Sequence, residues 1–195
     1  MKPAQHPTAV RTAQRLRDAG IDAQVVEFDQ PTRTSAEAAT AIGCSVAEIA
    51  KSIVFRGRTS GLAVVVVASG DNRVSEAKVA AKVDEPLARA DADFVRMATG
   101  YAIGGVAPIG HSQPVKLLLD RDLQRFATVW AAAGTPYSVF PVAPDELRRE
   151  RLPFGRPLRA PPARATRRLA GEAGRLDELF QPRRDRGLAG HHPQQ

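Results

Sequence analysis

The sequence has one cysteine, Cys44, among its 195 residues. A single cysteine can form neither an intramolecular disulfide framework nor a zinc cluster of thiolates, which fits a reducing compartment. The N-terminal residues MKPAQHPTAV lack the apolar segment of a signal peptide. The longest apolar run, GLAVVVVASG, is far shorter than the roughly 20 residues that span a bilayer. We therefore expect a soluble, cytoplasmic protein that does not contact a membrane.

An excess of basic charge is also missing from most of the chain, although the net charge is +7. Residues 1–147 carry 16 Lys and Arg against 16 Asp and Glu. Residues 148–195 carry the other 12 basic residues, all arginine, against 5 acidic ones. A polyanion-binding surface over the whole body is therefore not predicted, because the excess charge belongs to the C-terminal part.

Several catalytic signatures are absent as well. The sequence contains no H-x-E with C-x-x-C, no G-x-S-x-G and no pair of spaced histidines. We therefore predict no metal site, no cofactor and no serine-hydrolase triad. Cys44 has no activating partner nearby in the sequence, which favours a packed thiol over a nucleophile.

Hydrophobic periodicity and capping signals predict a mixed sheet surrounded by helices rather than a strict βαβ repeat. A helix is expected over 8–20 with Thr8 as its N-cap, and a second over 35–43, opened by the capping box Thr34–Glu37. Another capping box, Ser45–Glu48, opens a short turn. Further helices are expected over 72–83 and after residue 143. Strands are expected over 23–28, 52–57, 62–70, 114–120 and 135–142. Residues 121–130 are expected to form a short helix that leads into a strand. The continuous β-branched run in 62–70 indicates a strand buried on both faces.

The composition divides the chain into a folded part, 1–147, and an Arg/Pro-rich C-terminal extension, 148–195. The extension has few large apolar residues, so we expect it to be partly disordered. Only residues 167–180 have the apolar spacing of a helix.

The segment GYAIGGVAPIGH, residues 100–111, combines backbone freedom at two adjacent glycines with the restraint of a proline. It is either a tight turn or a loop that holds main-chain N–H groups in place for a carbonyl, phosphate or oxyanion. It has neither the Walker A sequence nor G-x-G-x-x-G spacing.

Three other side chains each have two interpretations. Lys51, between a turn and a buried strand, either extends to water or supplies a cation to a phosphate or carboxylate. His111 is either a general base or a hydrogen-bonded structural residue. Asp120 either caps the next turn or lines a binding site.

The runs GCSVAEIAKSIVFRG, GLAVVVVASGDNRVSEAKVAAKV and ATGYAIGGVAPIGH, followed by VKLLLDRDL, resemble the YbaK/ProX family of aminoacyl-tRNA editing domains. The likeness covers residues 8–147 and is carried by the lysine that ends AEIAK and by the glycine-x-x-x-proline loop, Gly104 to Pro108. It implies an α+β fold with a mixed, barrel-like sheet surrounded by helices. It also implies a metal-independent deacylase that hydrolyses the ester between a wrong amino acid and the terminal adenosine of tRNA.

The resemblance further implies roles for individual residues. The backbone amides around Gly104, Gly105 and Val106 would bind the ester carbonyl, and Lys51 would hold the phosphate or ribose of the tRNA end. A water assisted by the ribose hydroxyl would be the nucleophile. The loop would be fixed by Pro108, while His111 and Asp120 are candidates for substrate binding. The expected partners are mischarged tRNA and, as a second possibility, an aminoacyl-tRNA synthetase.

Two other hypotheses remain open from the sequence. A non-catalytic module of the same fold would hold an aminoacyl end or a synthetase without hydrolysis. Alternatively, the unusual C-terminal extension has replaced a closing element and leaves the body inactive, or it has added an arm that attracts tRNA.

Overall fold

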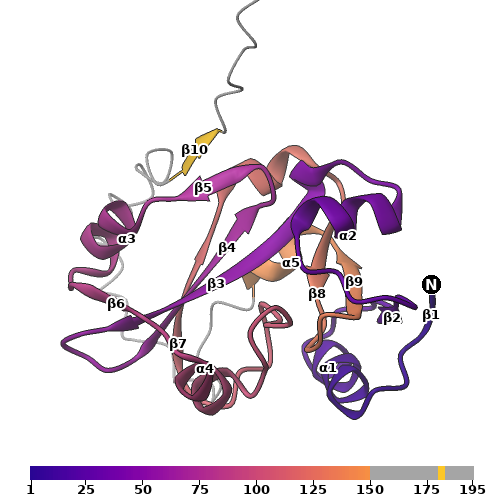
Figure 1. Cartoon of the computed structure of the whole chain (residues 1–195), viewed down its shortest axis with the longest axis horizontal. Coiled ribbons are helices and arrows are strands. Elements are labelled where there is room, and N and C mark those ends of the chain that lie inside the picture. Colours follow the sequence, from indigo (N-terminus) through magenta and orange to yellow (C-terminus); the bar gives the residue numbers. More distant parts are fainter. Residues whose placement is uncertain (150–179, 183–195) are drawn as a thin grey trace, which may run out of the picture.

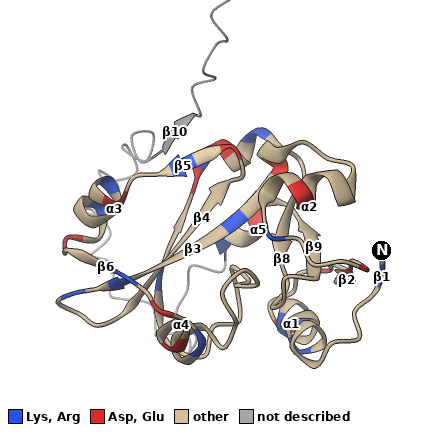
Figure 2. Cartoon of the chain, in the orientation of Figure 1, with Lys and Arg blue, Asp and Glu red and all other residues tan. Residues whose placement is uncertain are grey.

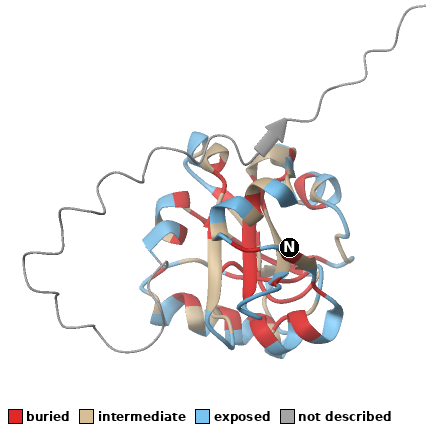
Figure 3. Cartoon of the chain, turned by 90° about the vertical axis from the view of Figure 1, so that its left-hand side faces the viewer, coloured by how far each residue is buried: buried red, intermediate tan, exposed pale blue. Residues whose placement is uncertain are grey.

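Strand β4 (Ala63–Ser69) is buried along its whole length at the centre of the molecule (Figure 3). Successive side chains of a strand point to opposite faces. Accordingly Val65 and Val67 pack in one hydrophobic cluster, whereas Val64 and Val66 pack in another. The predicted strand buried on both faces is therefore confirmed. The computed structural model, shown in Figure 1, describes residues 1–149 and 180–182.

The strands form a mixed sheet. Strand β3 (Ile49–Gly57) pairs antiparallel with β4, and β7 (Val115–Leu119) pairs parallel with it. The main sheet has the order β1-β2-β9-β8-β3-β4-β7, with the further bounds β1 (Lys2–Pro3), β2 (Val26–Glu27), β9 (Ser138–Val142) and β8 (Val129–Ala132). Strand β6 (Leu87–Arg89) pairs with β3 beside this path. The predicted mixed α+β class is confirmed.

The predicted barrel-like closure is not confirmed. The two end strands, β1 and β7, pair with β2 and β4 but not with each other, so the sheet is open within the part of the chain that the structure describes. Strand β2 has only two residues, where the sequence predicted six. A two-residue strand offers few main-chain groups through which further strands could complete a barrel.

One edge of β3 is only partly covered. Along it, β8 pairs with Ile49 and Ala50, and β6 pairs with 55–57. Within the described ranges no strand pairs with residues 51–54 on this edge, while β4 covers the other edge throughout. Main-chain groups of successive residues alternate between the edges of a strand. Gly57 donates to Leu62 on the β4 side and Arg58 to Pro86 on the β6 side, so the amides of Ser52 and Val54 face the gap.

The helices surround this sheet, as Figure 1 shows. They are α1 (Pro7–Asp18), α2 (Ser35–Ile42), α3 (Glu76–Val83), α4 (Ala92–Thr99) and α5 (Pro144–Arg149), with single 3₁₀ turns at Val46–Glu48 and Arg121–Arg125. Helix α1 packs on the cluster that contains Val65, and α3 packs on the one that contains Val64. Each face of the central strand is thus covered.

Some predicted helix boundaries are confirmed and others are wrong. Thr34 caps α2 and Gly43 ends it with φ +84°, and the capping box Ser45–Glu48 is present. The N-cap of α1 is His6 rather than Thr8, because Pro7 starts the helix and the His6 ring accepts from the Thr8 amide. The predicted helix over 72–83 begins only after Ser75, since β5 (Asn72–Val74) precedes it.

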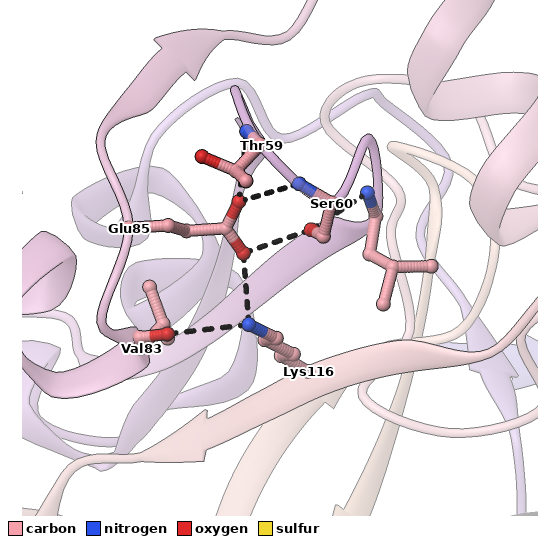
Figure 4. Close-up of polar contacts among 6 residues, drawn as sticks. Thr59, Ser60, Val83, Glu85 and Lys116 are labelled. Carbon is pink, nitrogen blue, oxygen red and sulfur yellow. Dashed lines mark hydrogen bonds and ion pairs between the residues drawn. The ribbon is translucent and has the colours of Figure 1, made fainter.

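Glu85, in the segment after α3, is joined to β7 by an ion pair and to the β3–β4 turn by hydrogen bonds (Figure 4). The Glu85 carboxylate accepts from Lys116 at 2.8 Å and from the amides of Thr59 and Ser60. These contacts, led by the one with Lys116, lower the pKa of Glu85 to about 2. The far end of β3 is therefore fixed by a carboxylate that stays charged near neutral pH.

Little of the C-terminal extension is described. Strand β10 (Phe180–Pro182) pairs antiparallel with β5 in a second, two-stranded sheet. Phe180 is therefore in a strand, although the sequence predicted the end of a helix there. The rest of that predicted helix, and the disorder expected for 148–195, concern residues that are almost all outside those described.

Figure 2 shows blue and red residues on most elements of the body, which is consistent with its balanced charge.

Candidate functional site

A cavity of about 550 Å³ lies between β3, the start of α2 and two loops. This volume is within the range of small-molecule sites, roughly 300–1,000 Å³. Three residues predicted from the sequence line it together: Lys51, Gly104 and Val106. The other lining residues include Ser35, Ala38, Ala50, Trp130, Thr135 and Ser138. The structure thus brings the lysine and the glycine-rich loop, which are far apart in the sequence, to one cavity.

Lys51 is on β3, and its ammonium is held by the turn that follows β4. The Nζ atom donates to the carbonyl oxygens of Gly70 at 2.9 Å and Asn72 at 2.5 Å. A lysine ammonium is a flexible point charge on a four-carbon stem. Two carbonyls of one turn therefore fix the position of this cation at the cavity wall.

The turn that holds Lys51 is itself built on Asp120. The buried Asp120 carboxylate accepts from the Ser69 amide at 3.0 Å and from the Asn72 side chain at 2.8 Å. It also accepts from the Asp122 amide and so caps the 3₁₀ turn. Burial raises the pKa of Asp120, while the bond from Asn72 and the two amides oppose that rise. Asp120 does not line the cavity, so the structure supports capping and not the predicted direct contact with substrate.

Gly104 and Gly105 are required in the loop for different structural reasons. Gly104 has φ +86°, a left-handed conformation that glycine adopts without strain. At Gly105 a Cβ would lie 2.6 Å from the Thr135 Cα, so this residue allows the loop to lie directly against the 134–135 backbone. The Gly105 carbonyl accepts from the Gly134 amide at 2.8 Å.

The loop's amides also differ. The Gly105 N–H donates to the Ala102 carbonyl at 3.0 Å and is not available to a ligand, which corrects the prediction that it binds an ester. Within the described residues, the N–H groups of Gly104 and Val106 donate no hydrogen bond. Both residues line the cavity. Two main-chain donors are therefore left at its wall.

Pro108 and His111 lie behind this wall and do not line the cavity. Pro108 is buried, and the half-buried His111 contacts the Ala107 carbonyl through Nε2 at 2.9 Å. The ring of Tyr101 meets that of His111 edge to face, and its hydroxyl donates to the Ile109 carbonyl. Burial lowers the pKa of His111, so the imidazole is neutral at pH 7. Of the two interpretations of His111, this geometry favours the structural one.

Sequence analysis missed the side of the cavity formed by β8, β9 and the loop between them. Trp130, Thr135 and Ser138 line it, and the two hydroxyls lie 2.7 Å apart. The only signal was the polar TPYS segment before a strand, which is typical of any turn. Their place in the site depends on β8 pairing with β3, which the sequence does not indicate.

Cys44 is partly buried and packs against Ala38, Ala39 and Ile49. Burial raises the pKa of its thiol, which disfavours the thiolate. Among residues 1–149 and 180–182, no group of three or more His, Cys, Asp or Glu side chains is placed to hold a metal ion. None of the helices described there has the length and apolar character needed to cross a membrane.

This fold and cavity define a small α+β protein with a cavity between strand β3 and a glycine-rich loop. Residues 29–150 match the model of the aminoacyl-tRNA editing domain. This match covers more than half of the chain, and the chain belongs to that family.

The chain is also similar to individual proteins. The chain is 35% identical over 123 residues to uncharacterized protein YwhH of Bacillus subtilis, covering 63% of this chain and 78% of YwhH. It is 32% identical over 129 residues to the proline–tRNA ligase of Xanthomonas campestris, covering 64% of this chain but 20% of the ligase. A solved structure of a protein proposed to be a trans-editing enzyme for prolyl tRNA synthetase is 43% identical, with a TM-score of 0.70 over 74% of this chain and 91% of that one.

Proposed function

We propose that this protein is a trans-editing hydrolase that removes a wrong, small amino acid from the 3′-terminal adenosine of tRNA. The observation that carries the proposal is the meeting of Lys51 with the unused amides of Gly104 and Val106 at one cavity, in a chain of the editing-domain family. Action in trans is supported by the similarity to a protein that is proposed to act in trans, because this chain matches 91% of that protein's length.

In this proposal the ester carbonyl binds at Gly104 and Val106. Attack by water places negative charge on the carbonyl oxygen, and amides already fixed in position stabilise that charge. One such donor is worth about 3–4 kcal/mol in the transition state. Pro108 and the Tyr101–His111 pair keep the loop in place from behind, and none of them exchanges a proton with the substrate.

The Lys51 ammonium binds the ribose or phosphate of the tRNA end. The carbonyls of Gly70 and Asn72 hold it at a set position on the cavity wall. The attacking water is oriented by the ribose hydroxyl of the substrate. As the ester C–O bond breaks, the proton of the water passes to the leaving ribose oxygen, so no side-chain base is required. The amino acid lies near Ser35, Ala38 and Ala50, whose short side chains fit alanine, serine, threonine or cysteine.

We also propose that residues 1–147 form the catalytic domain and that 148–195 supply an arginine-rich arm for tRNA. The support is the charge distribution, since the body is neutral and the excess of +7 lies in the extension. Phosphate contacts from basic side chains provide much of the affinity for nucleic acids. A partner synthetase fits the similarity to a proline–tRNA ligase.

Incubating the full chain with a panel of mischarged tRNAs tests the proposal. We expect hydrolysis of at least one small aminoacyl-tRNA and a loss of about tenfold or more in kcat/KM for Lys51→Met, which keeps the apolar stem but removes the cation. The matched control, Lys78→Met on α3, lies outside the cavity and should change kcat/KM less than about twofold.

Melting temperatures of both variants show whether the loss is one of folding, because Lys51 also bonds to the turn after β4. Hydrolysis no faster than in buffer for every tRNA tested would refute the proposal. Binding of aminoacyl-tRNA without any turnover would instead identify the chain as a non-catalytic module.

A further inference from the structure

A second cavity, of about 480 Å³, continues from the first along β3. Four residues line both cavities: Ser52, Ile53, Gly104 and Val106. The second cavity extends over residues 52–55 of β3, three steps of about 3.3 Å each, or roughly 10 Å. The loop that carries the unused amides therefore stands at the junction of two adjoining spaces.

Much of the lining of the second cavity is apolar. Val54 and Phe55 come from β3, whereas Val95 comes from α4 and Ile103 from the loop. Ile103 is 57% exposed although it is a large apolar residue in a structured loop. An apolar lining suits a flat ring, because a ring placed against it is removed from water.

Charged and polar groups are also present in this cavity. Arg89 and Glu76 line it, and within the described residues neither side chain has a hydrogen bond or an ion pair. The Ser52 hydroxyl is buried and has no partner in the described part of the chain. The uncovered edge of β3, at residues 51–54, faces the same space. A guanidinium suits a phosphate, and a carboxylate accepts from an exocyclic amine.

We infer that the second cavity binds the terminal nucleotide of tRNA, with its base against the apolar lining and its 5′-phosphate at Arg89. This inference rests on the proposed function for the identity of the ligand. It divides the substrate at the ester: the amino acid enters the first cavity, the nucleotide enters the second, and Lys51 remains for the ribose. Both parts then meet at Gly104 and Val106.

Calorimetric titration of the full chain with adenosine 5′-monophosphate tests the site without requiring catalysis. We expect Arg89→Glu to weaken binding about tenfold or more and Ile103→Asp to weaken it about fivefold or more. The matched controls are Arg96→Glu and Met97→Asp on α4, which change exposed residues of the same kind outside both cavities. Each control should change the dissociation constant less than about twofold.

Fragments of the nucleotide assign the two ends of the cavity. Adenosine lacks the phosphate, so its affinity should not depend on Arg89. Ribose 5-phosphate lacks the base, so its affinity should not depend on Ile103. Fluorescence of Trp130, the single tryptophan of the chain, reports on the first cavity, where it lies.

Equal effects of Arg89→Glu and Arg96→Glu on nucleotide affinity would overturn the inference. It would also be overturned if the nucleotide quenches Trp130 fluorescence and its affinity is unchanged in both Arg89→Glu and Ile103→Asp. If mischarged tRNA is hydrolysed while these variants leave its KM unchanged, the inference fails and the proposed function stands. If the nucleotide binds with the expected dependence on Arg89 but no tRNA is hydrolysed, the proposed function fails and the nucleotide site stands.

Discussion

His111 and Asp120 are titratable side chains near the site that do not line its cavity. Each is bonded to the main chain of a segment that carries a site residue. His111 contacts the Ala107 carbonyl in the glycine-rich loop, and Asp120 accepts from Ser69 in the turn that holds Lys51. We therefore propose that both act by positioning those segments.

Replacing His111 by glutamine should leave most of the activity. A glutamine amide can still donate to the Ala107 carbonyl, so we expect kcat/KM within about fivefold of the parent. Loss of the donor in His111→Ala should cost about 1 kcal/mol of stability. Deacylation assays and thermal melts measure both effects. A loss of about a hundredfold or more in His111→Gln, with normal melting, would instead identify a general base.

Replacing Asp120 by asparagine should disturb Lys51 indirectly. An asparagine directs an N–H₂ group at donors, so at least one of the bonds to Ser69, Asn72 and Asp122 is lost. Bonds to a charged group contribute about 1.5–3 kcal/mol, and we expect a loss of stability of this size together with a lower kcat/KM. Asp22→Asn, at an exposed position, is the control for urea unfolding. Unchanged stability in Asp120→Asn would contradict this account.

At the scale of elements, the site depends on two loops packed main chain to main chain. We predict that Gly105→Ala is more damaging than Gly104→Ala. A Cβ at Gly105 would meet the Thr135 backbone at 2.6 Å, so one loop must move. At Gly104 the nearest atom is 3.8 Å away, and only the left-handed conformation is disfavoured, by about 1–2 kcal/mol. Thermal melts rank the two variants, and the opposite order would refute the packing argument.

The hairpin of β3 and β4 should respond to acid through Glu85. Its folded-state pKa, about 2, lies below the ordinary value of 4.5, so ionised Glu85 stabilises the fold. This contribution is complete above about pH 4.5 and is lost as the pH falls toward 2. Glu85→Gln should therefore lower the melting temperature at pH 7, with the difference from the parent shrinking below about pH 4. The neighbouring Asp84→Asn should follow the parent curve, and a difference for Glu85→Gln that is constant with pH would contradict the ion-pair origin.

At the scale of the whole molecule, charge and fold belong to different parts of the chain. The body holds both cavities and has no net charge, while the extension holds 12 arginines. Through β10, the extension also reaches β5, which begins at Asn72, one of the two carbonyl partners of Lys51. The proposed arm for tRNA is therefore joined by a strand to the turn beside the site.

Neutralising Arg183, Arg184 and Arg186 to glutamine in the full chain should raise KM for tRNA and reduce its dependence on salt. The slope of log affinity against log salt becomes shallower by about 0.7–0.9 for each phosphate that the protein no longer neutralises. The control replaces Arg17, Lys82 and Arg96 of the body, which changes the net charge by the same amount. Equal slopes for the two triple variants would show that the extension makes no special interaction with tRNA.

The predictions from sequence that succeeded concern local patterns. Thr34 and Ser45 with their glutamates open the expected turns, and the valine run forms the buried strand. The helix predicted over 72–83 failed at its start because pairing with β10 holds 72–74 as a strand. Strand β2 is shorter than predicted, because a short apolar run does not determine how many of its residues pair with a neighbouring strand.

The sequence by itself determined the mixed α+β class, the buried central strand, the neutral body and the two motifs that place the chain in the editing-domain family. Capping, periodicity and charge are local properties, so they can be read without the fold. The tertiary structure decided that Lys51 meets Gly104 and Val106, that Gly105 is used for packing, and that Asp120 and His111 bond main-chain groups instead of lining the cavity. These depend on which strands and loops come together, and contacts between residues far apart in the chain leave no periodic trace in it.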